Sequence, residues 1–388
     1  LLFSSAFVFL ETSLKAYGEP KIIWRGSFKT HLNLGEHQVL SREIGTTARS
    51  SLTTSRINYL AWFNESTYLD AAYAFSVQIA KRDSNLGVYE TLKYRVSDLG
   101  DSPDGKFGNN VYFSQNFDRF TIGHSFEESE VLVGRQAVSF GSAKFSNPTD
   151  VFLPYPVGNV DSEFRTGVDA IRYKRPFGEM SELDVGMVFG GDGKIGNNAF
   201  FISSSQPIRS WDTTIIYIYY RENALFGIDL QGSLLNQGVW LEASNNKMRK
   251  KEVGVSESFN RVALGMDYRV SEETLVFAEY QHNGAGSAEK EDYAGLGGTL
   301  AYLEGGVFFQ GRNYVIPSIS HQFTPLLIGS ASILLNVDDG SVHETKRVEW
   351  SLDDNSFVDI TAYSASGSKA SEYSKTKSRF VGSLRVYF

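Results

Sequence analysis

The strongest constraint on the fold is an alternation of apolar and polar residues that recurs along the chain. In residues 22–34 (IIWRGSFKTHLNL), apolar side chains such as Trp24 and Leu32 stand at even positions, whereas Arg25 and Lys29 stand at odd positions. The same pattern recurs in the segments 69–79, 223–234, 261–270 and 380–388. Successive side chains of a β-strand point to opposite faces, so each segment has one apolar face and one face that accepts charge. A tilted strand that crosses a bilayer needs about ten residues, which is the length of these segments.

The connections between these segments alternate in length in the second half of the chain. Short ones lie near residues 177–179, 236–238, 271–273, 323–325 and 353–355, and long polar ones cover 141–164, 246–258, 284–311 and 365–377. Short turns at one end and long loops at the other are typical of outer-membrane barrels, which have an even number of strands. The sequence therefore predicts an all-β, transmembrane antiparallel β-barrel of about 18 strands, within a range of 16 to 20. A soluble β-sandwich is the alternative, but its strands are commonly shorter.

Closure of the barrel requires its first and last strands to pair, because unpaired backbone groups are costly in hydrocarbon. We place these strands at residues 22–34 and 378–388, and expect Phe388 at the membrane interface. Two regions leave alternatives open. When turns are counted from the two ends of the chain, the strand directions disagree within residues 80–127. The segment 110–117 is therefore either a strand or part of a loop. Residues 294–306 form either a strand or a loop with a short helix.

Residues 1–20 allow two interpretations, while 21–388 are expected to form a single barrel. The stretch LLFSSAFVFL is apolar but too short to span a bilayer, and it is similar to part of a secretory signal. Alternatively, Phe3, Phe7, Leu10 and Leu14 form one stripe of an amphipathic helix. The first interpretation predicts a signal remnant and the second a retained N-terminal helix.

Composition argues against several classes of function. The chain of 388 residues contains no Cys, which excludes disulfides and thiolate metal sites, and its net charge of −8 disfavours nucleic acid as a partner. None of its six His residues stands in a recognisable catalytic motif. We therefore predict no catalytic, cofactor-binding or metal-binding residues, and do not expect an enzyme.

Charged residues on the polar face predict a water-filled lumen. A Lys or Arg facing lipid at the bilayer midplane costs about 2 to 4 kcal/mol, so these charges must face inward. A barrel of 16 to 18 strands is wide enough for an aqueous channel. The pore-lining residues predicted on the strands are Arg25, Lys29, Arg56, Lys93, Arg95, Asp229, Arg269, Glu279 and Arg385. They either neutralise one another or form a ladder that sets ion preference, with basic early strands favouring anions.

The most distinctive stretch is a predicted loop over residues 142–164. Pro148, Pro154 and Pro156 cannot continue a central strand, and a loop of this length is a candidate for function.

Several motifs resemble a broad set of porins related to alginate-export and carbohydrate porins. They are GRQ at Gly134, NPTD at Asn147, NVDDGS at Asn336 and WSLDDN at Trp350, which together span about residues 130–388. The resemblance implies a loop that folds into the lumen, with Asp150 or Asp161 set against Arg135 and Arg172 as further pore-lining residues.

The ending FVGSLRVYF also resembles the C-terminal signature of Gram-negative outer-membrane proteins. That resemblance implies recognition by the barrel-assembly machinery and a location in the Gram-negative outer membrane, in contact with its lipid and lipopolysaccharide. Small residues on the outer face, such as Gly26 and Ala71, suit packing into a homo-oligomer, a trimer or higher. The function expected is a porin for passive diffusion of small solutes and ions. The alternatives are a structural, oligomer-forming barrel whose N-terminal helix contacts neighbours or lipid, and a plugged, substrate-specific transporter.

Overall fold

The computed structural model describes residues 21–36, 47–80, 93–99, 111–152, 163, 165–191, 194–249 and 258–388. These residues form one sheet of 18 strands. The strands are β1 (Lys21–Glu36), β2 (Thr47–Trp62), β3 (Thr67–Ala80), β4 (Val111–Ser125), β5 (Glu130–Gln136), β6 (Val168–Pro176), β7 (Glu182–Val188), β8 (Ala199–Ile208), β9 (Trp211–Tyr220), β10 (Asn223–Leu234), β11 (Gln237–Lys247), β12 (Ser258–Arg269), β13 (Thr274–Asn283), β14 (Asn313–Thr324), β15 (Leu327–Asn336), β16 (Val342–Asp353), β17 (Ser356–Ser366) and β18 (Arg379–Tyr387).

Helices occur only as single turns in the described connections. They are η3 (Ile195–Asn197), η4 (Lys290–Asp292), α1 (Tyr293–Leu296) and α2 (Leu300–Glu304). Of the two alternatives for residues 294–306, the structure has the loop with short helices. None of the helices in the described part of the chain is long and apolar enough to cross a membrane.

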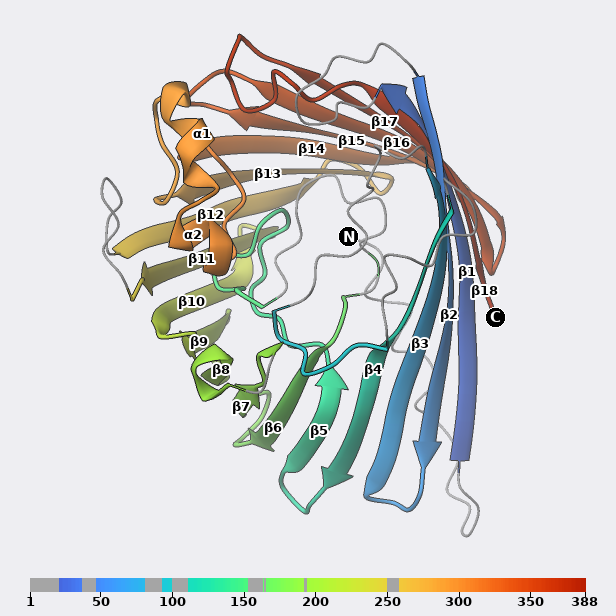
Figure 1. Cartoon of the computed structure of the whole chain (residues 1–388), viewed down its shortest axis with the longest axis vertical. Coiled ribbons are helices and arrows are strands. Elements are labelled where there is room, and N and C mark those ends of the chain that lie inside the picture. The colour runs from blue at the N-terminus through green and yellow to red at the C-terminus, as the bar shows by residue number, and fades with distance from the viewer. Residues whose placement is uncertain are drawn as a thin grey trace.

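The sheet closes into an antiparallel barrel, because β1 pairs with β2 on one side and with β18 on the other (Figure 1). At the seam, Thr30 lies opposite Leu384 and Leu34 lies opposite Phe380. The predicted fold class, the strand number and the pairing of first and last strands are thereby confirmed.

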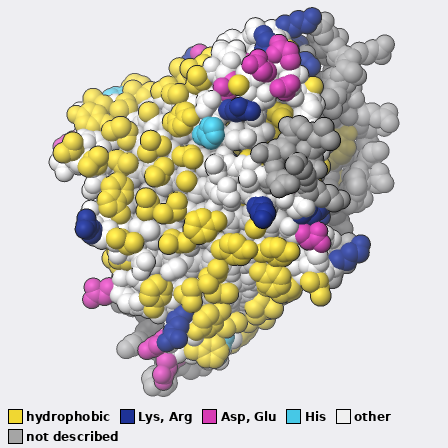
Figure 2. Space-filling model, turned by 90° about the vertical axis from the view of Figure 1, so that its left-hand side faces the viewer, with side chains coloured by type: hydrophobic (Ala, Val, Ile, Leu, Met, Phe, Trp, Pro, Cys, Tyr) yellow, Lys and Arg dark blue, Asp and Glu magenta, His cyan; other side chains and the backbone are white. Residues whose placement is uncertain are grey.

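The two faces of each strand meet different surroundings, as the alternation predicts. On β1 the even-numbered Trp24 and Leu32 are exposed on the outer surface, whereas the odd-numbered Lys29 is 1% exposed on the inner side. Figure 2 shows one side of this wall, where hydrophobic side chains cover much of the surface and charged side chains gather towards its margins. This distribution is what a barrel surrounded by hydrocarbon requires.

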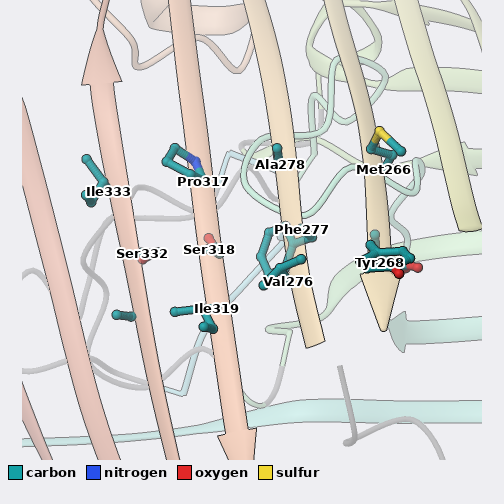
Figure 3. Close-up of a pocket in the computed structure, with 12 residues that line it drawn as sticks. Met266, Tyr268, Val276, Phe277, Ala278, Pro317, Ser318, Ile319, Ser332 and Ile333 are labelled. Atoms are coloured by element: carbon teal, nitrogen blue, oxygen red, sulfur yellow. The ribbon is translucent and has the colours of Figure 1, made fainter. Parts of the chain in front are cut away.

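An open groove of about 530 Å³ interrupts the outer wall between β12 and β15 (Figure 3). Small residues such as Ala278 and Ala331 line it, and larger residues such as Met266 and Ile333 flank them. Pro317 lies in the same groove, and the pairing of β14 with β15 is interrupted beside it, as expected for a residue without an N–H donor. The groove belongs to the apolar outer face and not to the lumen.

The connections at one end of the barrel are all short, whereas the other end carries the longer connections and one two-residue turn, Arg221 and Glu222. Leu235 and Asn236, which join β10 to β11, have φ values of 52° and 68°, the geometry of a tight hairpin turn. Residues 111–117 belong to strand β4, so of the two alternatives for this region the structure has the strand; residue 110 lies outside the described residues. The placement of Lys93 and Arg95 on a strand is wrong, however, because residues 93–99 form turns. The backbone of this segment is hydrogen-bonded instead to β6 and to the loop after β7. Asp169 N donates to Tyr94 O at 3.0 Å, and Gly191 N donates to Lys93 O at 3.1 Å.

Candidate functional site

One part of the inner wall is apolar and supports a packed core inside the barrel. On β9, the inward side chains of Ile216, Ile218 and Tyr220 are buried. The outward side chains between them are apolar as well, so both faces of this strand are apolar. They belong to a cluster with inward residues of β6, β7, β8 and β10. A hydrated wall would not carry such residues, so another part of the chain must cover them.

That cover comes from the connection between β5 and β6. Val138, Phe140, Val151 and Phe152 pack into the same cluster, together with Tyr94 from the segment 93–99. The ring centroids of Phe140 and Phe201 lie 5.2 Å apart, and those of Tyr94 and Phe152 lie 5.1 Å apart. Residues 137–152 therefore run along the inside of the barrel, and they include residues 142–152 of the predicted loop.

Two buried carboxylates hold this segment to the neighbouring part of the wall, on β11 and β13, and we call them the carboxylate clamp. Glu242 of β11 accepts hydrogen bonds from the backbone N–H groups of Ser142 and Ala143, each at 3.1 Å, and from Thr149 N at 2.7 Å and Oγ1 at 2.6 Å. Hydrogen bonds are strong in such a dry environment. At Gly141, where φ is +95°, a Cβ atom would overlap the Glu242 carboxylate, so glycine is required there.

Glu279 of β13 is the second member of the clamp. It accepts from Lys144 N at 2.7 Å and Phe145 N at 3.2 Å, and from the Trp240 indole Nε1 at 2.8 Å. Arg261 of β12 lies between the two carboxylates in strand order and donates to Ser146 Oγ at 2.9 Å. Residues 142–149 are thus fixed by the three adjacent strands β11, β12 and β13.

The predicted opposition of Asp150 to Arg135 and Arg172 is not found. Asp150 is 2% exposed and pairs with Arg165, whose Nη1 lies 2.8 Å away. Arg172 pairs instead with Asp184 of the adjacent strand β7. These charges are neutralised by nearby partners, and Asp161 lies outside the described residues.

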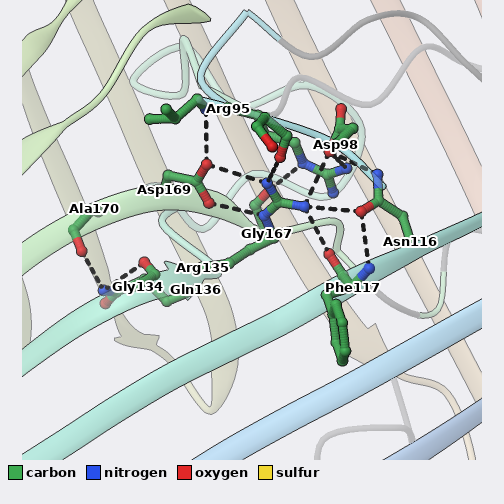
Figure 4. Close-up of polar contacts among 12 residues, drawn as sticks. Arg95, Asp98, Asn116, Phe117, Gly134, Arg135, Gln136, Gly167, Asp169 and Ala170 are labelled. Carbon is green, nitrogen blue, oxygen red and sulfur yellow. Dashed lines mark hydrogen bonds and ion pairs between the residues drawn. The ribbon is translucent and has the colours of Figure 1, made fainter. Parts of the chain in front are cut away.

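Arg135 lies at the centre of a polar cluster on β4, β5 and β6 (Figure 4). Its Nε donates to Asp169 at 2.8 Å and its Nη1 to Asp98 at 3.0 Å. Asp98 also accepts from Arg95 at 3.0 Å and from Asn116 at 2.6 Å. Burial alone would raise the pKa of Asp98, but the hydrogen bond from Asn116 and the charges of Arg95 and Arg135 outweigh it and hold that pKa below its usual range. The cluster ties the segment 93–99 to the inner wall.

The remaining predicted pore-lining residues fall into two groups. Some are buried and paired on the inner side, namely Lys29 with Glu163 at 2.8 Å, Arg56 with Asp118 at 3.1 Å, Arg385 with Asp359 at 3.4 Å, Asp229 with Ser142 Oγ, and Glu279 in the clamp. Arg25, Lys93 and Arg269 are exposed instead. Arg269 donates to Glu272 O in a short turn at 3.2 Å. The pore-lining role of all these residues stays a prediction.

Sequence reasoning missed Glu242, Trp240 and the inner apolar core. The run TTIIYIYY over residues 213–220 carries apolar side chains on both faces of one strand. Because a wall that faces water would be polar on that side, this run indicates that another part of the chain covers its inner face. Glu242 stands on the same inward parity as Ser244 and Asn246, so alternation could have found it. Within the described ranges, no group of three His, Asp or Glu side chains could hold a metal ion.

Comparison with known proteins gives likeness of fold only. No protein-family model matches the chain, and no curated protein sequence matches it. Among solved structures, Acinetobacter baumannii OccAB4 is similar with a TM-score of 0.57 at 10% identity, over 96% of this chain and 98% of that one. Pseudomonas aeruginosa OccK5 (OpdH) is similar with a TM-score of 0.57 at 8% identity, over 94% and 97%. Acinetobacter baumannii OccAB1 has a TM-score of 0.56 at 9% identity, over 94% and 96%.

Proposed function

We propose that this chain is an outer-membrane porin that passes small solutes and ions by diffusion through a narrowed, water-filled lumen. The observation that carries the proposal is a closed barrel with an apolar outer face and charged residues on its inner face. Only a closed sheet can lie in hydrocarbon without unpaired backbone groups. Inward charges require water or one another as partners, and a barrel of this strand number has room for water.

The segment 142–152 is the proposed constriction. The carboxylate clamp fixes its first part, and the inner apolar core supports its last two residues, 151 and 152. A segment held in this way has little freedom to leave the lumen, so we expect a passage of constant, narrow width. This rigidity favours a channel that discriminates by size over a wide, unselective opening.

The membrane and the partners belong to the same proposal. Closed antiparallel barrels with an even number of strands are typical of the bacterial outer membrane. The apolar outer face would contact its lipid and lipopolysaccharide, and the barrel-assembly machinery would insert the chain. Assembly into a homo-oligomer stays a prediction. Diffusion through a channel requires no catalytic residue, and we propose no enzymatic activity.

Conductance in planar bilayers tests the proposal. The full chain should give stepwise ion currents, and a chain that lacks residues 1–20 should give currents of similar size. A full chain that stays sealed, but opens when residues 1–20 are removed, would overturn the open porin and favour a plugged transporter. A chain that stays sealed in both forms would favour a structural barrel.

A further inference from the structure

We infer that copies of this chain associate through the outer wall of β15 to β17, where Lys346 of one copy pairs with Glu344 of the next. This inference rests on the proposed membrane location and goes beyond the channel function, since a single barrel can conduct alone. It follows from a charged pair on the apolar outer face, from the small side chains around that pair and from the groove beside it.

A charged pair lies on the outer face of β16. Glu344 and Lys346 share the outward parity of this strand with the exposed Val348. Lys346 Nζ lies 2.8 Å from Glu344 Oε2, and the two side chains are 64% and 35% exposed. Ser364 of β17 donates to the same carboxylate oxygen at 3.0 Å. We call these three residues the charged patch, and it lies on the face that should meet hydrocarbon.

The charged patch reaches into the apolar band of the outer wall. Lys346 is the fifth of the 12 residues of β16, and the residue directly opposite Glu344 on β15 is the exposed, apolar Ile333. By contrast, Arg175 and Lys247, which also face outward, stand within two residues of a strand end. A charge at a strand end reaches water or headgroups easily, and a charge in the interior of a strand does not.

The ammonium group of Lys346 has too few partners within its own chain. It carries three N–H donors, but Glu344 is the one acceptor that the described residues provide for it. Hydrocarbon offers no acceptor, and charged groups within a membrane are therefore found with partners or beside water. A second polar surface is needed to cover the charged patch.

A second copy of the same wall is the surface that fits. The charged patch carries one cation and one anion two residues apart on one strand, so each Lys346 can face the partner's Glu344 when two copies meet. The pair has no net charge, so two copies do not repel one another. An anionic lipid headgroup, in contrast, would be attracted by Lys346 but repelled by Glu344.

Small side chains beside the charged patch allow two walls to approach closely. Ala331 of β15 and Ala362 of β17 lie directly opposite Lys346 on its two sides. Ala331 also lines the outer groove of about 530 Å³, together with Ala278 and Pro317 (Figure 3). The charged patch is therefore continuous with a depression into which larger apolar side chains of a second copy can pack. Close contact of this kind stabilises association inside a membrane, where lipid competes for apolar surface.

Charge reversal distinguishes a contact between copies from the contact within one chain. Lys346→Glu gives the patch two acids and Glu344→Lys gives it two bases, so each variant should repel its own copies. We expect each variant alone to raise the dissociation constant of the assembly at least about tenfold in detergent, measured by analytical ultracentrifugation. A mixture of the two variants should associate again, although neither chain then has its internal pair. Arg175→Glu is the control and should leave association unchanged, because Arg175 forms its exposed ion pair with Glu128 near a turn.

Cross-linking tests the same contact in a bilayer. Because the chain contains no Cys, Ala362→Cys places a single thiol beside the charged patch. Ala243→Cys is the matched control, since Ala243 also faces outward but lies on β11. In phospholipid vesicles without lipopolysaccharide, a short bifunctional thiol reagent should join copies of Ala362→Cys and leave Ala243→Cys as monomers.

A mixture of the two charge variants that stays monomeric would overturn the contact between copies. So would Ala362→Cys that is labelled in vesicles but not joined. Association that appears only when lipopolysaccharide is added would assign the charged patch to that lipid and would also overturn the contact. A monomer that carries current would leave the proposed porin function intact, whereas a chain that associates but carries no current would contradict the porin and not the interface.

Discussion

At the scale of single residues, a buried carboxylate can fix a loop more firmly than a surface ion pair can. Glu242 has three backbone N–H groups and one hydroxyl as donors, all from the segment 142–149. If Glu242 is lost, these donors stay buried without an acceptor, and each such group costs about 1 to 3 kcal/mol. The side chain therefore couples the stability of the barrel to the shape of its lumen.

We expect Glu242→Ala to lower the free energy of unfolding by about 2 to 3 kcal/mol and to enlarge the single-channel current. Denaturant titration in detergent and planar-bilayer recording measure the two effects. Glu182→Gln is the control, because Glu182 forms a partly exposed ion pair with Lys174 near a turn. An exposed pair contributes at most about 1 kcal/mol. Equal behaviour of the two variants would contradict the role of the clamp.

Gly265 of β12 leaves space for the indole ring of Trp240. A Cβ atom there would overlap the ring of Trp240, which crosses β12 to donate to Glu279 of β13. We expect Gly265→Ala to displace the ring and to change the near-UV circular dichroism of the folded barrel. Gly382→Ala is the control, because no atom lies within 4 Å of its added Cβ. An unchanged spectrum in Gly265→Ala would refute the close packing.

At the scale of elements, alternation predicted the strands well and the inward segments poorly. β1 and β18 differ from the predicted ranges 22–34 and 378–388 by two residues at most. A strand that separates lipid from water has to alternate apolar and polar side chains, so a short stretch of sequence is enough to recognise it. Residues 93–99 and 137–152 are fixed by contacts with distant strands, and no local period records these contacts. For the same reason, Arg135 could be predicted to face inward, but its partners Asp98 and Asp169 could not be predicted.

The long connections are joined to one another at the rim, and this joint should depend on pH. Glu372, between β17 and β18, accepts from Tyr314 Oη at 2.6 Å, Gln310 N at 3.0 Å and Asn336 Nδ2 at 2.8 Å. Burial raises the pKa of Glu372 above its usual value of 4.5, and these hydrogen bonds only partly offset the shift.

The raised pKa gives the pH dependence its sign. Above about pH 4.5 the unfolded loop releases this proton while the folded loop still holds it, so rising pH destabilises the folded form until the raised pKa is passed. Hydrogen exchange of residues 367–378 should therefore show stronger protection at the acid end of this window. Glu372→Gln should flatten the profile, whereas Glu291→Gln at an exposed position should not. A profile that Glu372→Gln leaves unchanged would exclude Glu372 as its source.

At the scale of the whole molecule, the barrel combines two kinds of interior. Near β6 to β9, and at the loop ends of β14 and β15, where Tyr314, Ile316 and Leu334 are buried, it is packed like the core of a soluble protein. Nearer the short turns of β14 to β16, small hydroxyls face inward. One closed wall supports both interiors, so the integrity of the seam between β1 and β18 decides the stability of the whole. Gly26 and Phe388 meet at one end of that seam, where Gly26 N donates to Phe388 O at 2.6 Å and Phe388 N to Gly26 O at 2.9 Å.

The ring of Phe388 lies against Gly26, and a Cβ atom at Gly26 would overlap it. We expect Gly26→Leu to push the ring away and to weaken the last backbone pair of the seam. Overpacking of this kind costs about 1 to 3 kcal/mol. Since opening the seam exposes unpaired strand edges to lipid, this loss should lower the temperature at which the folded barrel unfolds in detergent. Gly382→Leu is the matched control, because Gly382 also faces outward at the seam but has open space around it. If both variants unfolded at the temperature of the unaltered chain, the contact between Gly26 and Phe388 would not contribute to closure of the barrel.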